Sequence, residues 1–301
     1  MPTVHTLDLN FQGRPQTIAA YLVPHATGGI LVEAGPGSTI PALQHALHAH
    51  GLTAADISDV FLTHIHLDHA GAAGWLAQQG ARIHVHANGA PHLLNPEKLI
   101  ASATRIYGER MDTLWGQFYT VPPEKLSILQ DGQVVEAGGL QVRAIDTLGH
   151  ARHHLVYMVD GICFSGDTGG IRLPGNRHVS LPMPPPEFHV EEWRQTLARL
   201  RQEKMTHIVP THYGVYDDPD WHLAALSEAL DEVEAWMEAV MPSEPSTEEL
   251  RQRFAAFEQQ RLERSGIRAE GSRSHALANP TDMSADGIAR YWRKYRAAPQ
   301  G

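Results

Sequence analysis

The feature that most constrains this chain is a run of four metal-binding side chains within six residues. Residues 63–71 contain, in order, His64, His66, Asp68 and His69. Imidazole and carboxylate groups suit zinc and its first-row neighbours, and three protein ligands per ion leave one position open for water. Because their spacing prevents all four side chains from facing one way, the stretch predicts two metal ions rather than one.

The metal-binding run joins a predicted strand to a predicted helix. Residues 59–63 are apolar enough for a short buried strand, and residues 70–77 are small and helical in pattern. His64 and His66 lie two apart in a near-extended turn, so they point together, whereas Asp68 and His69 begin the helix and point elsewhere. We therefore expect two groups of ligands at one strand-to-helix turn.

Three further metal-binding residues follow, each after an apolar run. They stand in the sequences Gly149-His150, Phe164-Ser165-Gly166-Asp167 and Pro210-Thr211-His212. With the first run they resemble the His-x-His-x-Asp-His signature, and its ordered continuation, of the metallo-β-lactamase-fold hydrolases. A motif of this kind is a hypothesis that its structural context must confirm.

The resemblance implies a role for each of the seven residues. One ion would be held by His64, His66 and His150. The second would be held by Asp68, His69 and His212, and Asp167 would bridge the two ions. Zinc is the expected metal, with iron or manganese as alternatives. A run of solvated polar residues would explain one His-x-His pair but not seven ligand types in this order.

The resemblance also implies an α/β fold, a four-layer αβ/βα sandwich with the site at one edge of two sheets. Short apolar segments between glycine and proline turns predict strands at 4–10, 18–24, 30–34, 59–63, 82–86, 126–129, 134–135, 140–145, 154–159, 162–164 and 206–210. Helical spacing predicts helices at 41–50, 70–77, 97–115 and 190–203. These elements would form a catalytic domain over residues 1–216.

Residues 217–301 are predicted to form a helical extension. Helical patterns cover residues 221–241, 247–264 and 283–297, with Ser284 as the N-cap of the last helix. Residues 268–281 contain glycine and serine and predict a mobile loop. The extension would either cap the pocket or contribute a homodimer contact. Its basic residues near the end of the chain are more typical of a solvated helix face than of a nucleic-acid site.

Composition narrows the partners and the compartment. The 301-residue chain has 24 basic and 34 acidic residues, a net charge of −10, which argues against nucleic acid because phosphate binding relies on lysine and arginine. Its 20 histidines are the compositional anomaly that metal chemistry explains. One cysteine, Cys163, excludes an internal disulfide and favours the cytoplasm. No signal peptide or stretch long enough to span a bilayer is visible, so no membrane partner is expected.

A long loop after Asp167 is a candidate pocket wall. Residues 168–188 are rich in proline, which limits the freedom of the unfolded chain and favours an ordered loop. Candidates for contact with a small-molecule substrate are Arg172, Arg177, His178 and Met183, although each is equally consistent with an ordinary loop residue. Tyr213, next to His212, either donates a hydrogen bond to a polarised substrate oxygen or packs beside the site.

The predicted chemistry is hydrolysis by two metal ions. Two dications sharing Asp167 and a bridging water would lower the pKa of that water, so that hydroxide is the nucleophile near neutral pH. Asp68 would orient the water or accept its proton. By analogy with the glyoxalase II-like branch of the resembled family, the substrate would be an ester, thioester or lactone.

Three alternative functions remain open at the level of sequence. Residues 164–168 are similar to those of phosphodiesterases and RNA-processing enzymes, but the acidic chain lacks a large inserted nuclease domain. An iron-dependent oxidoreductase is the second alternative. Flavodiiron proteins, however, would have glutamate where His66 stands, and persulfide dioxygenases lack a full second site. The third is a metal-stabilised binding module without catalysis, which a complete set of ligands disfavours.

Overall fold

Two β-sheets form the centre of the computed structural model, which describes residues 1–297. The first sheet has six strands, β1 (His5–Asp8), β2 (Ala19–His25), β3 (Gly28–Val32), β4 (Ile57–Phe61), β5 (Arg82–His86) and β6 (Leu126–Leu129). They lie side by side in chain order. The first three pair antiparallel, and β3 to β6 pair parallel.

The second sheet has five strands, β7 (Val134–Ala137), β8 (Leu140–Asp146), β9 (Leu155–Val159), β10 (Ile162–Phe164) and β11 (His207–Val209). Its order is β11-β10-β9-β8-β7, and only β10 and β11 are parallel neighbours. Strands β3, β9 and β10 are buried along their whole length, as their continuous apolar sequences predict.

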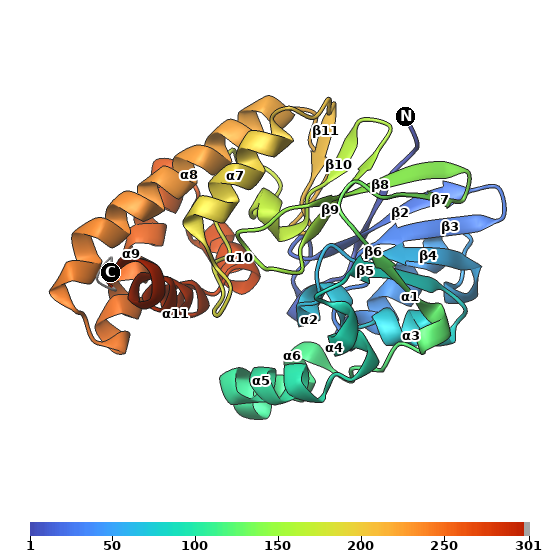
Figure 1. Cartoon of the computed structure of the whole chain (residues 1–301), viewed down its shortest axis with the longest axis horizontal. Coiled ribbons are helices and arrows are strands. Elements are labelled where there is room, and N and C mark those ends of the chain that lie inside the picture. The colour runs from blue at the N-terminus through green and yellow to red at the C-terminus, as the bar shows by residue number, and fades with distance from the viewer. Residues whose placement is uncertain (298–301) are drawn as a thin grey trace.

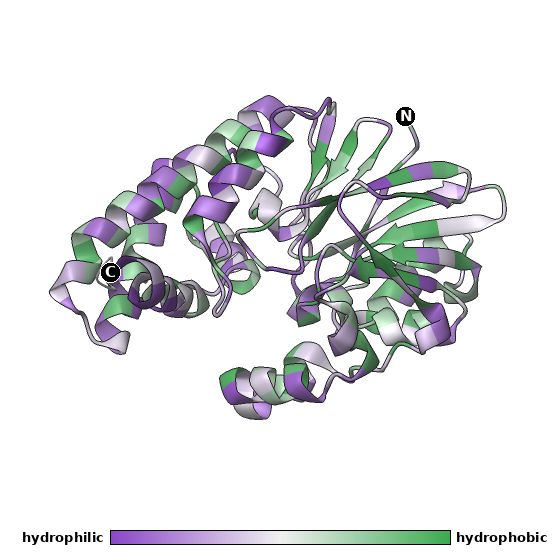
Figure 2. Cartoon of the chain, in the orientation of Figure 1, coloured by the Kyte–Doolittle hydropathy of each residue, from purple (hydrophilic) through white to green (hydrophobic). Residues whose placement is uncertain are grey.

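Three apolar clusters separate four layers of structure (Figure 1). Leu43 of α1 (Ile40–Ala49) and Leu76 of α3 (Ala73–Gln78) pack on the outer face of the first sheet. Tyr21 and Tyr157 belong to the cluster between the two sheets. Trp193 of α7 (Val190–Leu200) packs in the cluster on the outer face of the second sheet. The predicted four-layer αβ/βα sandwich is confirmed, and Figure 2 shows its apolar residues concentrated along the strands.

The C-terminal region is helical, as predicted. It comprises α8 (Pro219–Val240), α9 (Thr247–Arg264), α10 (Ala269–Ala278), α11 (Thr281–Tyr291) and a π-helical turn (Trp292–Arg296). Leu226 of α8 packs in the same cluster as Trp193, so this region shares its core with the second sheet. A domain boundary at residue 216 stays a prediction, and residues 298–301 of the predicted extension lie outside the described residues.

Two details of the predicted C-terminal region are wrong. The mobile loop expected at residues 268–281 is largely the helix α10, which is held by buried contacts such as the hydrogen bond from Asn279 Nδ2 to the Leu181 carbonyl, 3.1 Å. Ser284 does not cap the last helix, which begins at Thr281. Its hydroxyl instead accepts a hydrogen bond from the Met183 N–H at 3.3 Å and so holds the proline-rich loop.

The helix predicted over residues 97–115 is broken in two. Helix α5 (Glu97–Tyr107) ends at Gly108, where φ is 54°, and α6 (Met111–Trp115) follows a short 3-10 turn. A positive φ favours glycine because a Cβ atom would be strained there. With α4 (Ala90–Leu94), these helices form a lobe at the lower edge of the view in Figure 1.

Candidate metal centre

The predicted ligands follow strands that end at one edge of the two sheets. Parallel strands β3 and β4 both run toward this edge, as do parallel strands β10 and β11 in the second sheet. The carboxyl ends of parallel strands are where sites form in α/β proteins. The run from His64 to His69 therefore meets Asp167 and His212 there, although the run and His212 are more than 140 residues apart in the chain.

The first group of side chains consists of three histidines whose ring nitrogens face one another. His64 Nε2 lies 2.8 Å from His66 Nδ1, and His150 Nε2 lies 3.2 Å and 3.1 Å from these two atoms. Nitrogen ligands at about 2.0–2.1 Å from a tetrahedral zinc ion would be roughly 3.3 Å apart. The three nitrogens are therefore spaced like the ligands of one ion.

The second group consists of Asp68, His69 and His212. Asp68 Oδ2 lies 3.6 Å from His69 Nε2 and 3.5 Å from His212 Nε2. Asp167 stands between the two groups. Its Oδ1 lies 3.3 Å from His69 Nε2 and 3.6 Å from His212 Nε2, while its Oδ2 lies 3.5 Å from His150 Nε2. One carboxylate thus presents an oxygen to each group.

Hydrogen bonds behind the histidines leave their lone pairs directed at the centre. The Nδ1–H of His150 donates to the Pro182 carbonyl at 2.8 Å, and that of His212 donates to the Thr17 carbonyl at 2.8 Å. Because a carbonyl oxygen only accepts, Nδ1 carries a proton in both rings, and the neutral form of each ring has its lone pair on Nε2. This tautomer is the one that binds a metal through Nε2.

A buried carboxylate that the sequence analysis did not single out supports both groups. Glu33 follows β3, and its Oε1 accepts hydrogen bonds from His69 Nδ1–H at 3.0 Å and from the hydroxyls of Thr63 at 2.5 Å and Thr211 at 2.9 Å. The only signal in the sequence is an acidic residue between an apolar strand and Gly35. Its φ of 69° lies in the left-handed region, and such strain is concentrated at functional sites.

Thr63 transmits the influence of Glu33 to the first group. The Thr63 hydroxyl has one proton, which it donates to Glu33, so it accepts the Nδ1–H of the adjacent His64 at 3.1 Å. His64 is thereby fixed with its Nε2 lone pair toward His66 and His150. Glu33 orients one histidine of the second group directly and one of the first group through a hydroxyl.

Two acidic side chains remain ionised although they are buried. Burial alone raises the pKa of Asp68, but His69 and His212 outweigh it and bring the pKa down to about 2. Burial acts on Asp167 in the same direction, and the same two histidines hold its pKa well below the usual range. The centre therefore concentrates negative charge, which attracts cations.

The pKa values of the histidines shift in two directions, downward in the first group and upward at His69. Burial lowers the pKa of His150 to about 4, and burial with the neighbouring imidazoles lowers the pKa of His64 well below its usual value. Burial also opposes protonation of His69, but Asp167, Asp68 and Glu33 outweigh it and raise the pKa. Protons and metal ions compete for the same lone pairs.

A separate observation, on unpartnered buried atoms, also fits the binding of divalent metal ions by these residues. His69 Nε2 and Asp167 Oδ1 are buried and have no hydrogen-bond partner among the described residues, although both lie in the middle of the cluster. An unpartnered buried polar atom is costly unless another group satisfies it. Glu33, His64 and His69 also lie close enough together to hold a metal ion. His69 Nδ1–H, however, donates a hydrogen bond to Glu33, so we assign these three residues to support of the ligands rather than to a third metal site.

Gly166 lets the loop before Asp167 approach the cluster. Its φ is 51°, and a Cβ there would lie 2.5 Å from the Thr63 hydroxyl and 2.7 Å from His154 Nε2. Both atoms are held in place by hydrogen bonds, because the Thr63 hydroxyl donates to Glu33 and His154 Nε2 accepts from the Thr168 N–H at 3.3 Å. Glycine is required here to bring Asp167 between the two groups.

The structure does not bring the predicted substrate-contact residues to the cluster. Arg172 is buried and forms two hydrogen bonds with Asp218, at 2.6 Å and 3.1 Å, beneath the rings of Tyr216 and Trp221. Arg177 is exposed and lies over the Trp221 ring. The proline-rich loop reaches the site through its backbone, at the Pro182 carbonyl.

His178, Met183 and Tyr213 are likewise occupied elsewhere. Met183 is part of the apolar cluster on the second sheet, and His178 Nδ1 lies 2.9 Å from the Ser265 hydroxyl. Tyr213 packs between the sheets with its hydroxyl toward Asp8, and burial followed by that carboxylate raises its pKa. The packing interpretation of Tyr213 fits this position better than a role beside the ligands.

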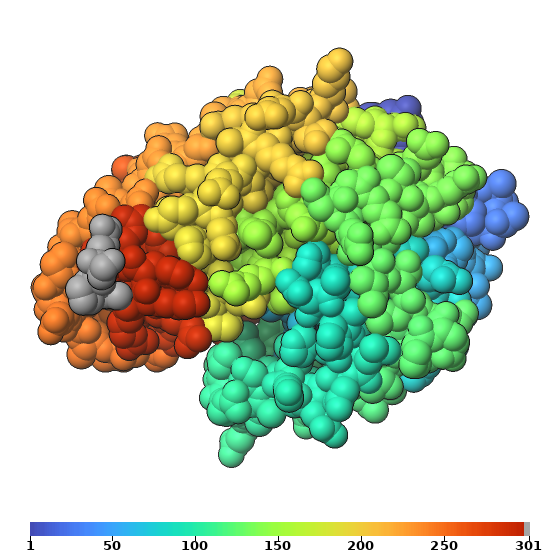
Figure 3. Space-filling view, viewed as in Figure 1, coloured from blue at the N-terminus to red at the C-terminus, as the bar shows by residue number. Residues whose placement is uncertain are grey.

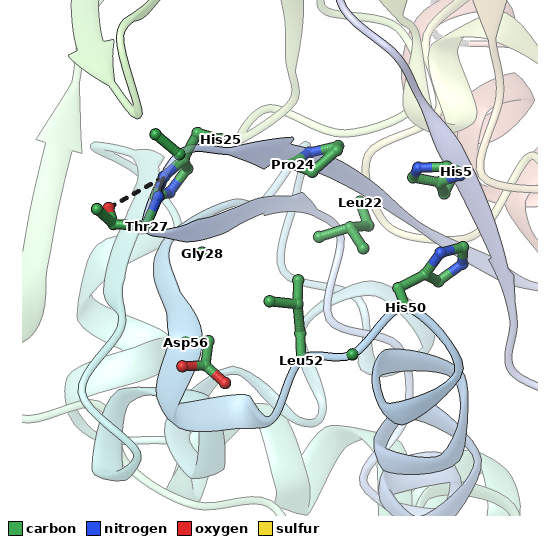
Figure 4. Close-up of a pocket in the computed structure, with 11 residues that line it drawn as sticks. His5, Leu22, Pro24, His25, Thr27, Gly28, His50, Leu52 and Asp56 are labelled. Carbon is green, nitrogen blue, oxygen red and sulfur yellow. Dashed lines mark hydrogen bonds between the residues drawn. The ribbon is translucent and has the colours of Figure 1, made fainter.

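A separate pocket of about 440 Å³ lies at the opposite end of the first sheet (Figure 4). It is bounded by the end of β2, the start of β3 and the segment before β4. The His5 and His50 rings face each other on one side with centroids 4.2 Å apart. Because β3 and β4 run away from this pocket toward the histidine cluster, the pocket is distinct from the candidate metal centre.

The family follows from a comparison with known proteins. Residues 13–212 match the family model described as the metallo-beta-lactamase superfamily, a span that contains all seven predicted ligands. The chain belongs to the metallo-beta-lactamase superfamily. This superfamily comprises metal-dependent hydrolases, and the chain carries His, Asp and Glu groups able to hold metal.

Individual relatives are distant. The chain is 29% identical to a metallo-beta-lactamase fold-containing protein of Sulfurisphaera tokodaii over 52% of this chain and 60% of the relative. It is 26% identical to a hydroxyacylglutathione hydrolase of Xanthomonas campestris over 89% of this chain and 91% of that enzyme. The first relatives are thus matched over only about 60% of their length.

The fold has close counterparts among solved structures. A metallo-beta-lactamase family protein from Thermus thermophilus superposes with a TM-score of 0.65 at 20% identity, covering 97% of this chain and 94% of that one. At this identity the likeness concerns the fold. Within the described part of the chain, none of the helices combines the length and apolar character that a membrane span requires.

Proposed function

We propose that this member of the superfamily is a hydrolase that uses two divalent metal ions, most simply zinc, to cleave an ester, thioester or lactone. The observation that carries the proposal is the position of Asp167, with one oxygen toward each of two three-residue groups. With three residues and one oxygen of the shared carboxylate, an ion that expands to five-coordinate would keep a position open for water or substrate.

The relatives support a carbonyl substrate. The Xanthomonas campestris relative is named a hydroxyacylglutathione hydrolase, and an acylglutathione is a thioester. The alignment with that enzyme extends beyond the shared family region over most of both chains. The net charge of −10 is also unfavourable for a polyanionic substrate, so a small acyl compound fits better than nucleic acid.

The residues of the chain would divide the work as follows. Bound divalent ions would supply Lewis acidity and lower the pKa of water. His64, His66 and His150 would hold one ion, Asp68, His69 and His212 the other, and Asp167 would fix their separation. Asp68 faces His69 and His212 through Oδ2, which leaves its second oxygen to orient an incoming water. Glu33 would keep the histidines in their metal-binding tautomers.

The proposal is tested by metal analysis and a substrate screen on the same preparation. We expect about two bound ions per chain and turnover of at least one of 4-nitrophenyl butyrate, S-lactoylglutathione and a homoserine lactone, with bis(4-nitrophenyl) phosphate untouched. Chelation should abolish turnover and added zinc should restore it.

A pair of matched variants completes the test. Asp167→Asn should lose turnover and bound metal, whereas Asp217→Asn, at an exposed position, should retain both. Unchanged turnover in Asp167→Asn, or after complete removal of metal, would contradict the proposal. Phosphodiester cleavage without ester, thioester or lactone cleavage would replace it with the phosphodiesterase alternative.

A further inference from the structure

Asp167 reaches both groups of ligands, and its position depends on the backbone on either side of it. Its Oδ1 has no hydrogen-bond partner among the described residues, although it is buried. The residue lies in a short 3-10 turn, Gly166–Gly169, that follows β10. The contacts that hold this turn therefore decide whether one carboxylate is able to face both groups.

Thr168, the residue after Asp167, is held from three directions by groups outside the turn. Its N–H donates to His154 Nε2 at 3.3 Å, and its hydroxyl donates to the Thr147 carbonyl at 3.1 Å. Its carbonyl accepts a hydrogen bond from the Trp193 Nε1–H at 2.9 Å. The Thr168 N–H belongs to the planar peptide group that also contains the Cα atom of Asp167. The hydrogen bond to His154 therefore fixes the plane from which the Asp167 side chain leaves.

The hydrogen bonds of His154 determine its tautomer. Because a backbone N–H only donates, Nε2 accepts, and the proton of the neutral ring is on Nδ1. Nδ1–H lies 2.8 Å from the Thr147 hydroxyl, which accepts this hydrogen bond and directs its own proton to the His154 carbonyl at 3.5 Å. The Thr147 hydroxyl thus sets the tautomer of His154, and this tautomer supplies the acceptor for Thr168.

His154 lies between the turn of Asp167 and the first group of ligands. Its ring stacks on that of His64, with centroids 5.0 Å apart and an angle of 28° between the planes. Figure 3 shows the surface hollowed between the α5–α6 lobe and the C-terminal helices. The His154 side chain is fully buried and lines no part of that surface, so it can influence a reaction only through its neighbours.

We propose that His154 is a positioning residue that holds Asp167 with one oxygen toward each group, so that both metal ions bind tightly. The inference rests on the proposed function, because it requires two ions that share Asp167. In this role His154 binds neither metal nor substrate, since its Nε2 lone pair is used by the Thr168 N–H. Without that acceptor the peptide after Asp167 is free to rotate, and a carboxylate that turns toward one group withdraws a ligand from the other ion. Residues that orient metal ligands typically change metal affinity by about 10–100-fold.

Two substitutions of His154 separate its acceptor from its donor. In His154→Gln the side-chain carbonyl oxygen can replace Nε2 and accept from the Thr168 N–H. In His154→Asn the side-chain amide can replace Nδ1–H and donate to Thr147, but no acceptor reaches Thr168. Competition with a chromophoric chelator measures the two zinc affinities. We expect the weaker one to fall by about 10–100-fold in His154→Asn and by less than about threefold in His154→Gln.

A spectroscopic measurement distinguishes a displaced Asp167 from a general loss of stability. Two cobalt(II) ions that share a carboxylate couple magnetically, which weakens the electron paramagnetic resonance signal of the fully loaded protein. We expect this coupling to persist in His154→Gln and to be lost in His154→Asn. Val233→Ala, which removes a buried apolar group of α8, is the control for lost stability and should retain both zinc affinities and the coupling.

A milder pair of variants at Thr147 keeps the test open if the His154 variants do not fold. Thr147→Ser keeps the hydroxyl that sets the tautomer, whereas Thr147→Val removes it, so only Thr147→Val should lose zinc affinity and cobalt coupling. Equal affinity and coupling in His154→Asn and His154→Gln, or in the two Thr147 variants, would refute the role of His154 and leave the proposed function standing. If Asp167→Asn retains turnover and both ions, the proposed function itself fails.

Discussion

Replacing Glu33 by glutamine tests whether one buried carboxylate orients both groups of ligands. Three donors converge on its Oε1, from His69, Thr63 and Thr211, and the Thr63 N–H faces Oε2 at 3.3 Å. Glutamine can place its carbonyl oxygen at the Oε1 position and keep three hydrogen bonds. Its amide group then faces the Thr63 N–H, so that two donors meet in a buried space.

The expected magnitude follows from these contacts. Hydrogen bonds to a charged acceptor contribute about 1.5–3 kcal/mol and neutral ones about 0.5–1.5 kcal/mol. Weakening three bonds and losing one should lower the free energy of unfolding by roughly 3–5 kcal/mol. Altering a residue that orients metal ligands lowers metal affinity by about 10–100-fold. Because Thr63 connects Glu33 to His64, both ions should be affected.

Urea unfolding of the chelator-treated protein measures the first effect, and competition with a chromophoric chelator measures the second. Glu136→Gln, at an exposed position of β7, is the matched control and should change neither quantity. The reasoning is refuted if Glu33→Gln unfolds within about 0.5 kcal/mol of the unmodified protein and binds metal with unchanged affinity. A loss of only one of the two ions would refute the connection through Thr63.

Three further predictions concern the frame around the centre. Burial lowers the pKa of His222 from 6.5 to about 4, so on acidification the unfolded chain takes up a proton before the folded chain does. The contribution of His222 to the free energy of unfolding should therefore be fully present above pH 6.5 and should fall by about 3 kcal/mol as the pH drops to 4. Urea unfolding at both pH values should show a smaller fall in His222→Gln than in the exposed control His48→Gln. Gly287→Ala would place a Cβ 1.9 Å from the Met183 carbonyl oxygen and should lower the free energy of unfolding by about 2 kcal/mol or more. In Gly271→Ala the new Cβ meets only the flexible Ile267 side chain, so the free energy of unfolding should change by less than about 1 kcal/mol. Equal effects in the two variants would contradict this packing. Arg172→Lys should lose the two-bond contact with Asp218 and about 2 kcal/mol of stability with KM unchanged, and a raised KM at full stability would restore Arg172 as a substrate contact.

Much of the frame could be predicted from sequence because the signals are local. The strand at Arg82–His86 and the helix over Thr247–Arg264 have the predicted bounds, since their apolar periodicity is read within a few residues. The helix predicted over 97–115 fails at Gly108, and the loop predicted at 268–281 is largely α10. Gly108 is visible in the sequence, and a Cβ there would meet no atom of the described residues within 4 Å, so its positive φ is a local property, whereas α10 depends on packing that composition does not report.

The substrate-contact candidates show the same limit. Arg172 and Met183 stand in a proline-rich loop, which is typical of an exposed pocket wall. In the fold, Arg172 finds a carboxylate 46 residues away, and Met183 is covered by α11. A polar or flexible side chain in a loop is buried whenever a distant element supplies a partner or an apolar surface, and no short window of sequence contains that information.

The sequence by itself determined which side chains are able to bind metal and in what order strands and helices follow, because ligand chemistry and periodicity belong to single residues and their near neighbours. The tertiary structure decided which of these groups face one another. The ring of His212 is oriented by the Thr17 carbonyl, 195 residues away, and Glu33 receives the Thr211 hydroxyl from 178 residues away. Hydrogen bonds over such separations exist only once the two sheets have packed, so the orientation of the ligands is a property of the folded chain.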